Sequence, residues 1–237
     1  MLFFFFLDLV AHILIRSLHR STQNSQTLWG KAKEAGIFDL EMAPVEVETR
    51  KGPQMVDTDE HPRPETTLEK IAGLKPVFKK DGAVTAANAS GICDGAGAVL
   101  VASEEAVKEY NLTPLARIVS YGVTGCDPTI MGIGPVTAIQ QALAKAGLTL
   151  GDVDRVEINE AFAAQFLACA KELDLDMNKT NLHGGAICLG HPLGASGSRI
   201  MAHLANEFHQ PGNTANIHVG SACIGGGQGI AIIMERA

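Results

Sequence analysis

Three side chains with the chemistry needed for acyl transfer lie at even spacing in the last third of the chain. Asn159, His191 and Cys223 are each separated by 32 residues from the next. An amide N–H can stabilise a developing oxyanion, an imidazole can act as a general base, and a thiol can give or take a proton. The set therefore predicts a site for carbonyl chemistry.

Cys223 opens a segment that carries glycine at 225, 226, 227 and 229. Glycine at this density allows positive φ and lets another group approach the main chain closely. Such a loop would leave the thiol accessible to a substrate. The alternative is a tight turn between two buried strands, with an inert buried cysteine.

Asn159 and His191 also lie where secondary structure is expected to change. Asn159 and Glu160 stand between a short strand and a helix, although they could simply start that helix. His191 lies in the glycine-rich segment 184–197, and Pro192 keeps it out of helical geometry; the alternative is an ordinary turn histidine. We expect all three candidates at strand–loop junctions, where α/β folds place their chemistry.

Three segments together resemble the signatures of the thiolase family, and they occur in the family's order. They are NEAFA at 159–163, GGAICLGHPLGASG at 184–197 and CIGGGQG at 223–229. Residues 84–91 also resemble a family element that lies along the pantetheine arm of coenzyme A. The resemblance runs from about Gln26 to the C-terminus and is strongest to the mitochondrial 3-ketoacyl-CoA thiolases of fatty-acid β-oxidation.

The resemblance implies an acyltransferase with coenzyme A as co-substrate and no permanently bound cofactor. The reaction would be thiolytic cleavage of 3-ketoacyl-CoA to acetyl-CoA and a shortened acyl-CoA, or the reverse condensation. His191 would activate a nucleophilic cysteine, and Cys223 would exchange protons with acetyl-CoA and coenzyme A. Asn159 would hold an ordered water that donates to a substrate oxygen.

Four further residues are expected around the substrate from the same resemblance. Ser90 and Arg63 would contact coenzyme A, and Met131 and Phe162 would line the acyl pocket. Arg63 could equally be a solvated charge, and Met131 and Phe162 could be plain core residues. The expected partners are acyl-CoA and coenzyme A, with a homo-oligomer (dimer or tetramer) in the full-length family.

The family's attacking cysteine belongs to its N-terminal half, and none of the five cysteines here has that local context. They lie at positions 93, 126, 169, 188 and 223. The chain is therefore expected to be a truncated thiolase, inactive alone. The alternative function is a non-catalytic coenzyme A-binding or subunit-interaction fragment.

A metal site is a further alternative for the histidines and cysteines of the glycine-rich segments. The residues His183, Cys188, His191 and Cys223 include a pair with ligand-like spacing, but the glycine pattern explains their loop without a metal. We expect no metal site. His203, His209 and His218 are expected on the surface.

Composition excludes some partners. A formal net charge of −7 argues against nucleic acid or an anionic membrane as the main partner. Five unevenly spaced cysteines suit a reducing compartment rather than a disulfide framework. Mitochondrial localisation follows from the resemblance alone, because the N-terminal segment is not Arg-rich.

Three regions are predicted. Residues 1–27 form a hydrophobic and polar leader unrelated to the family, too short and interrupted to span a membrane, with a linker at 17–27. The leader is interpreted as an alternative start, a weak targeting segment or a native helix. Residues 28–115 form a loop domain and the end of the N-terminal half, and residues 116–237 the C-terminal domain.

The expected fold class is α/β, a layered α/β/α/β/α thiolase-like fold with one complete C-terminal half, the loop domain and a remnant of the first half. Strands are expected at 98–102, 116–121, 155–159, 215–222 and 229–234, and helices from Ser103 and at 135–146, 160–173 and 198–208.

Overall fold

A four-stranded sheet forms the centre of the molecule in the computed structural model, which describes the backbone of residues 2–237 and side chains from residue 14 onward. Its order is β3-β6-β5-β4. The strands are β3 (Ala116–Gly125), β4 (Arg155–Ile158), β5 (Ile217–Ile224) and β6 (Gln228–Arg236). Only β4 and β5 run parallel; the other neighbours are antiparallel.

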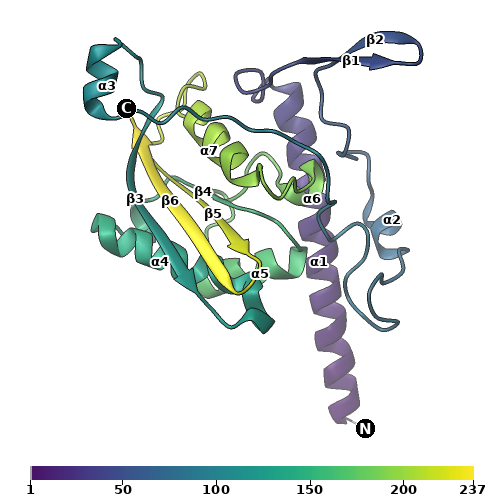
Figure 1. Cartoon of the computed structure of the whole chain (residues 1–237). Helices are drawn as coiled ribbons and strands as arrows, with labels where there is room; N and C mark the ends of the chain where they lie inside the picture. Colours follow the sequence, from purple (N-terminus) through teal and green to yellow (C-terminus); the bar gives the residue numbers. More distant parts are fainter. Residues whose placement is uncertain (1) are drawn as a thin grey trace.

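Helices cover both faces of this sheet (Figure 1). α4 (Gly134–Ala146) and α5 (Ala163–Leu173) lie on one face, and α7 (Ser196–Glu207) lies on the other. The alternation along β6 shows this directly. Ile233 belongs to the core with α4 and α5, whereas Met234 packs with Leu204 and Phe208 of the α7 side. Successive strand residues face opposite sides, so both faces are buried.

Single residues start or end two helices where the sequence predicts. Pro135 stands at the start of α4, and Gly147 ends it in the left-handed region at φ 69°. Ser103 caps α3 (Glu104–Glu109), its hydroxyl accepting from the Ala106 N–H at 3.2 Å. The helices and strands predicted from residue 116 onward are all present, with shifted ends.

The other elements after residue 34 are short. They are the hairpin β1 (Val45–Thr49) and β2 (Gly52–Val56), α2 (Leu68–Ala72), the 3-10 helices η1 (Pro128–Ile133) and η2 (Leu150–Asp152), and α6 (Ala186–Leu189). The hairpin stands apart from the sheet (Figure 1). Residues 28–82 thus contain little regular sheet beyond this hairpin, as predicted.

The strand predicted at 98–102 is wrong. These residues have no regular structure, and Leu100 is 85% exposed. A strand forms only where a neighbour can pair its backbone groups. No described strand pairs with this segment, so its apolar sequence alone does not make it extended sheet.

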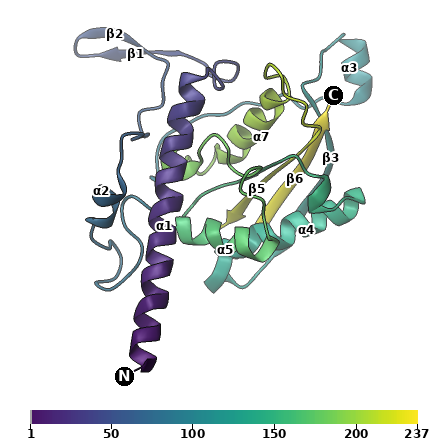
Figure 2. The same cartoon turned by 180° about the vertical axis from the view of Figure 1, so that it is seen from behind.

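The linker predicted at 17–27 is also wrong. These residues belong to α1 (Leu2–Glu34), a 33-residue helix that runs along the side of the molecule (Figure 2). Its polar residues Thr22, Ser25 and Gln26 are buried. A polar buried face hides the apolar periodicity by which helices are recognised. The leader is helical in the structure, and the choice between an alternative start, a weak targeting segment and a native helix stays a prediction. Among the described residues, no helix combines the length and apolar character needed to cross a membrane.

Candidate active site

Asn159 is held at the end of the sheet, directly after β4. Its backbone N–H donates to the Ser221 carbonyl at 2.9 Å and continues the pairing of β4 with β5. The residue is fully buried. Its side-chain Nδ2 lies 3.3 Å from Nε2 of His191, so the structure brings these two predicted site residues together.

His191 does not follow a strand, which corrects the predicted junction. It comes after α6, separated from it by Gly190 at φ 89°. A side chain at position 190 would clash with the thiol of Cys93, so glycine is needed here both for its φ and for the close approach. The backbone N–H of His191 then donates to the Gly91 carbonyl at 2.7 Å.

Ser196 fixes the imidazole of His191. Its hydroxyl lies 2.7 Å from Nδ1 and 3.2 Å from the Pro192 carbonyl. Because the hydroxyl can donate to Pro192, it accepts from an Nδ1–H, which leaves the Nε2 lone pair facing the amide of Asn159. Burial, and then the nearby Arg199 charge, lower the pKa of His191. The ring is therefore neutral near pH 7 and presents a basic nitrogen.

The side-chain oxygen of Asn159 gives a second indication of a binding site. Its Oδ1 is buried without a hydrogen-bond partner among the described residues. Buried acceptors are almost always paired with protein or ordered water, so an orphan of this kind marks a place for a donor. The amide therefore has one hydrogen on the histidine and one oxygen available to a water or a ligand group.

Cys223 lies in β5, one residue before the strand's end, where it pairs with Gly229 of β6. It is 9% exposed, so the predicted open loop is wrong and the thiol lies in a strand. Burial is the main cause that raises its pKa, and the neighbouring Cys126 raises it further. Since β4 and β5 run parallel, Cys223 and Asn159 lie at the same end of the sheet.

The glycines after Cys223 have a packing role. Gly227, at φ 87°, has the Cys126 carbonyl beside it, and Gly229 lies against the carbonyl of Gly134. Any side chain at either position would meet backbone. The segment is thus a tight turn between two strands, which is the alternative to the predicted open loop. It also brings the end of β5 against η1 and the start of α4.

Segment 88–92 runs beside the site, and the contact of its Ser90 with coenzyme A stays a prediction. Ser90 makes two hydrogen bonds to the Ala161 carbonyl, from its backbone N–H at 3.0 Å and its hydroxyl at 2.9 Å. Ala89 bridges Phe162, and Ile92 bridges His191. Residues 88–92 and 161–163 therefore form one wall next to Asn159.

The two predicted pocket residues are not plain core. Phe162 is 37% exposed at this wall, and Met131 is half-buried in η1. The thiol of Cys126 lies 3.9 Å from the Met131 carbonyl. Both positions are compatible with a pocket lining, which stays a prediction.

Arg63 turns toward its own loop. Its guanidinium donates to the carbonyls of Glu60, His61 and Pro62 at 2.6–2.9 Å. Its backbone N–H donates to the Gln26 side chain at 2.6 Å. The structure thus gives Arg63 a role in shaping its loop, and the predicted contact with coenzyme A is not part of this arrangement.

Sequence reasoning missed the supports of this site. Glu160 is buried and accepts from the hydroxyl of Ser25 at 2.7 Å and from the Ile187 N–H at 3.3 Å; burial raises its pKa. His61 lies 2.7 Å from the Cys188 carbonyl through Nδ1 and abuts Gly91. Ser196 could have been found from its place near the start of a helix after a His-Pro turn. Nothing in the sequence around Ser25 indicates its contact with Glu160.

The four possible metal ligands named from the sequence, His183, Cys188, His191 and Cys223, do not gather around one point. Cys188 is buried with its thiol on the Gln26 side chain at 3.2 Å, away from the Asn159–His191 pair. Among the described residues, the potential ligands that do gather are His183, His203 and Glu207. The surface prediction is wrong for His203 and His218, because each is buried by a specific partner. His209 is exposed as predicted.

Two family models match the chain. The thiolase N-terminal domain matches residues 16–105, and the thiolase C-terminal domain matches residues 112–236. The first match begins inside the segment predicted as an unrelated leader. The division of the chain into domains at residues 28 and 116 stays a prediction.

Curated relatives and solved structures agree with these matches. The mitochondrial 3-ketoacyl-CoA thiolase of Bos taurus is 64% identical over 92% of this chain and 54% of its own length. A probable acetyl-CoA acyltransferase of Staphylococcus epidermidis is 51% identical over 90% of this chain and 54% of its own.

The crystal structure of human mitochondrial 3-ketoacyl-CoA thiolase superposes with a TM-score of 0.92 and 60% identity, over 96% of this chain and 57% of that one. The predicted thiolase-like α/β fold is thereby confirmed. The chain spans about half the length of the curated relatives it matches. With both domain models matched and the site residues at the end of one sheet, the chain belongs to the thiolase family.

Proposed function

We propose that this chain carries the C-terminal catalytic groups of a thiolase-type acyltransferase. The reaction is the thiolytic cleavage of a 3-ketoacyl-CoA to acetyl-CoA and a shortened acyl-CoA, or its reverse. The observation that carries the proposal is the contact of Asn159 with the basic nitrogen of His191, beside a thiol at the same end of the sheet.

Each group suits one step of that reaction. A nucleophilic thiolate attacks the ketone carbon, the bond between C2 and C3 breaks, and the electron pair stays on the departing acetyl-CoA. His191 Nε2 takes the proton of the attacking thiol, and Cys223 gives its proton to the acetyl-CoA carbanion. The Cys223 thiolate then takes the proton of incoming coenzyme A, which attacks the acyl-enzyme and releases the nucleophile.

Asn159 contributes through water. Its unpaired Oδ1 accepts one hydrogen of a bound water, whose other hydrogen then points to the thioester or ketone oxygen. A preorganised donor of this kind is typically worth about 3 kcal/mol at the transition state. His191, held by Ser196, donates to the same oxygen once its Nε2 has taken the proton of the attacking thiol.

Coenzyme A is the proposed co-substrate, with no permanently bound cofactor. Support comes from a solved structure of human mitochondrial 3-ketoacyl-CoA thiolase in complex with CoA, which superposes with a TM-score of 0.90 and 59% identity. Ser90 and Arg63 are proposed along coenzyme A, and Met131 and Phe162 along the acyl chain. Mitochondrial localisation is proposed from the names of the relatives, and assembly as a homo-oligomer from the family resemblance.

The attacking thiol is the missing part. None of the five cysteines has the context of the family's nucleophile, so the acyl-enzyme step needs a thiol from outside these 237 residues. The second candidate, a non-catalytic coenzyme A-binding or subunit-interaction fragment, is favoured by the share of its relatives' length that the chain spans.

Reconstitution separates the two functions. The full chain is assayed for thiolysis of acetoacetyl-CoA alone, and after co-expression with the N-terminal part of the bovine relative that it does not match. We expect no activity alone and activity in the pair. In the pair, His191→Asn and Cys223→Ser should lower kcat by 10²–10⁴-fold, with His209→Asn as the exposed control. Activity that survives His191→Asn would overturn the assignment. Coenzyme A binding by calorimetry without activity in the pair would favour the fragment function.

A further inference from the structure

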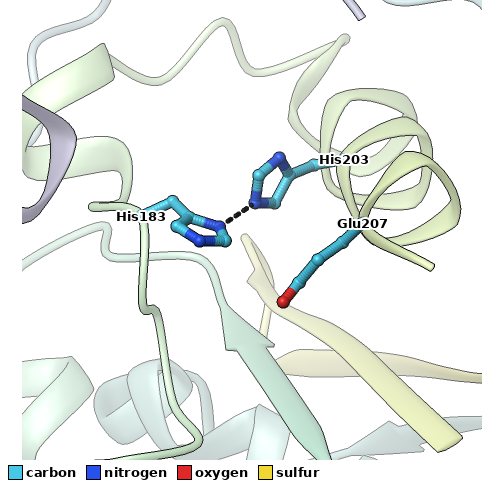
Figure 3. A group of neighbouring side chains, drawn as sticks. All are labelled: His183, His203 and Glu207. Carbon is cyan, nitrogen blue, oxygen red and sulfur yellow. Dashed lines mark hydrogen bonds between the residues drawn. The ribbon is translucent and has the colours of Figure 1, made fainter. Parts of the chain in front are cut away.

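A group of three possible metal ligands lies outside the proposed active site, on the α7 side of the sheet. His203 and Glu207 project from α7, and His183 projects toward them from the loop before α6 (Figure 3). One nitrogen or oxygen from each lies within 4.8 Å of the others. Residues 203 and 207 are one helical turn apart, so both side chains point to the same side of the helix.

The distances are close to those of a tetrahedral metal site. His183 Nδ1 lies 3.0 Å from His203 Nε2, with the two rings nearly perpendicular at 85°. Two ligands on zinc at 2.0–2.1 Å bond length lie about 3.3 Å apart in tetrahedral geometry. The nitrogens need to separate by only a few tenths of an ångström, and the carboxylate of Glu207 needs to approach by at most about 1.5 Å.

Each ligand also has an outer partner that orients it. His203 Nδ1 lies 3.0 Å from both carboxylate oxygens of Glu41, so it donates to Glu41 and leaves Nε2 for a metal. Glu207 Oε1 accepts from Arg155 Nε at 2.7 Å, and Oε2 is left for coordination. A carboxylate behind a ligating histidine is the usual support of zinc sites.

The surroundings favour a bound ion over a solvated charge cluster. His203 and Glu207 are buried, at 4% and 6% exposure, and the ring of Phe38 packs on both histidines. His183 is only partly buried and leaves a path to solvent. Two imidazoles and one carboxylate are a donor set that suits zinc, with a fourth position for water.

We propose that His183, His203 and Glu207 bind a zinc ion that ties the loop before α6 to α7. The ion would hold the loop before α6 against α7, and it takes no part in the acyl-transfer chemistry. The proposal is independent of the proposed function.

Metal binding by the full chain tests this. The protein is stripped with a chelator, titrated with Zn²⁺ and desalted, and retained zinc is measured by atomic spectroscopy; a parallel titration uses Co²⁺. We expect one zinc per chain, a Co²⁺ spectrum without thiolate charge-transfer bands, and a Tm that rises with zinc concentration because the ion binds the folded state. No retained zinc, or a Co²⁺ spectrum of thiolate ligation, would overturn the proposal.

Variants locate the site. Glu207→Gln keeps an acceptor for Arg155, and His183→Asn replaces a half-buried ring; each should weaken zinc binding more than 100-fold. Glu41→Gln, which removes only the outer partner of His203, should weaken it 10–100-fold. His209→Asn, an exposed histidine just beyond α7, should change nothing. If a ligand variant fails to fold by circular dichroism, Glu41→Gln decides. Zinc retained at wild-type affinity in His183→Asn or Glu41→Gln contradicts the site.

Discussion

Residues 116–237 and residues 83–115 are both rich in apolar runs, yet only the first region buries them. The sheet and its helices enclose Ile139, Phe166 and Ile233, each at most 2% exposed. Within 83–115 the buried residues are polar, Thr85 and Asn88, and no apolar side chain is buried. The apolar ones are half-buried or exposed, up to 85% for Leu100.

The difference lies in backbone pairing. From residue 116 onward, every described strand has a neighbour, and the side chains of β4 and β5 are mostly buried against helices, whereas the edge strand β3 is largely exposed. Segment 93–103 has no neighbour strand among the described residues, and its apolar residues at 98–102 are all exposed. An apolar sequence therefore becomes core only where the topology supplies a paired strand and a covering helix.

The largest expected effect is the loss of unfolding free energy on substitution of a core residue. Phe166→Ala should cost 3–5 kcal/mol of unfolding free energy, because it leaves a cavity between α5 and the sheet. Leu100→Ala should change it by less than about 0.5 kcal/mol. Urea denaturation monitored by circular dichroism measures both. Equal losses would mean that the 83–115 segment packs in solution.

Acid should destabilise the sheet region through His218. Burial is the main cause that lowers its pKa from 6.5 to about 4, and its ring stacks on Phe208 at a centroid distance of 3.7 Å. A lowered histidine pKa gives stability that is present above pH 6.5 and is lost as pH falls through about 4.

The loss is roughly 3 kcal/mol for a shift of this size. His218→Gln should flatten the decline of stability between pH 6.5 and 4, whereas His209→Gln should leave it unchanged. Denaturant midpoints across this pH range check it. A decline of the same steepness in both variants would show that other groups cause it.

The third effect tests whether α1 belongs with the compact region. Ser25→Ala leaves both the buried Glu160 carboxylate and the Gly185 N–H without their partner, at 2.7 and 3.0 Å. The expected loss is 1–3 kcal/mol. Asn24→Ala, on the exposed face of the same helix, should stay within about 0.5 kcal/mol. Thermal melts of both variants compare them, and a neutral Ser25→Ala would place α1 outside the cooperative unit.

The smallest effect is one of rates. Cys169 is fully buried, and burial raises its pKa to about 11, whereas Cys93 in the loose segment is half-buried. Limited iodoacetamide treatment followed by peptide mapping should label Cys93 first, then Cys223, with Cys169 last. Labelling of Cys169 before Cys223 would show that the end of β5 is more closed than its 9% exposure implies.

Sequence reasoning succeeded where a local signal and the final structure coincide. The helix starting near Pro135 and ending at Gly147, and the cap at Ser103, follow from single residues whose backbone preference acts within one turn. The contact of Asn159 with His191 was foreseen as a shared site. The contact itself depends on how the fold places β4 and the loop after α6, and the motifs predict only that the two residues share a site.

The failures share one physical cause, which is dependence on distant partners. Cys223 was placed in a loop because its glycines resemble one, but they allow backbone contact with Gly134 and Cys126. The buried polar face of α1 makes sense only beside Glu160 and Cys188. His203 looked like a surface residue until Glu41, 162 residues earlier, is seen beside it.

The docking of α1 has a consequence for how the chain folds. Ser25 meets Glu160 across a sequence separation of 135 residues, and Gln26 meets Cys188 across 162. Contacts so remote in sequence form late, since the loop entropy must be overcome before they stabilise anything. Ser25 and Gln26 are therefore synthesised long before Glu160 and Cys188 are available to them. During that interval the buried polar face of α1 has no native partner, so the docking of this helix is one of the last steps of folding.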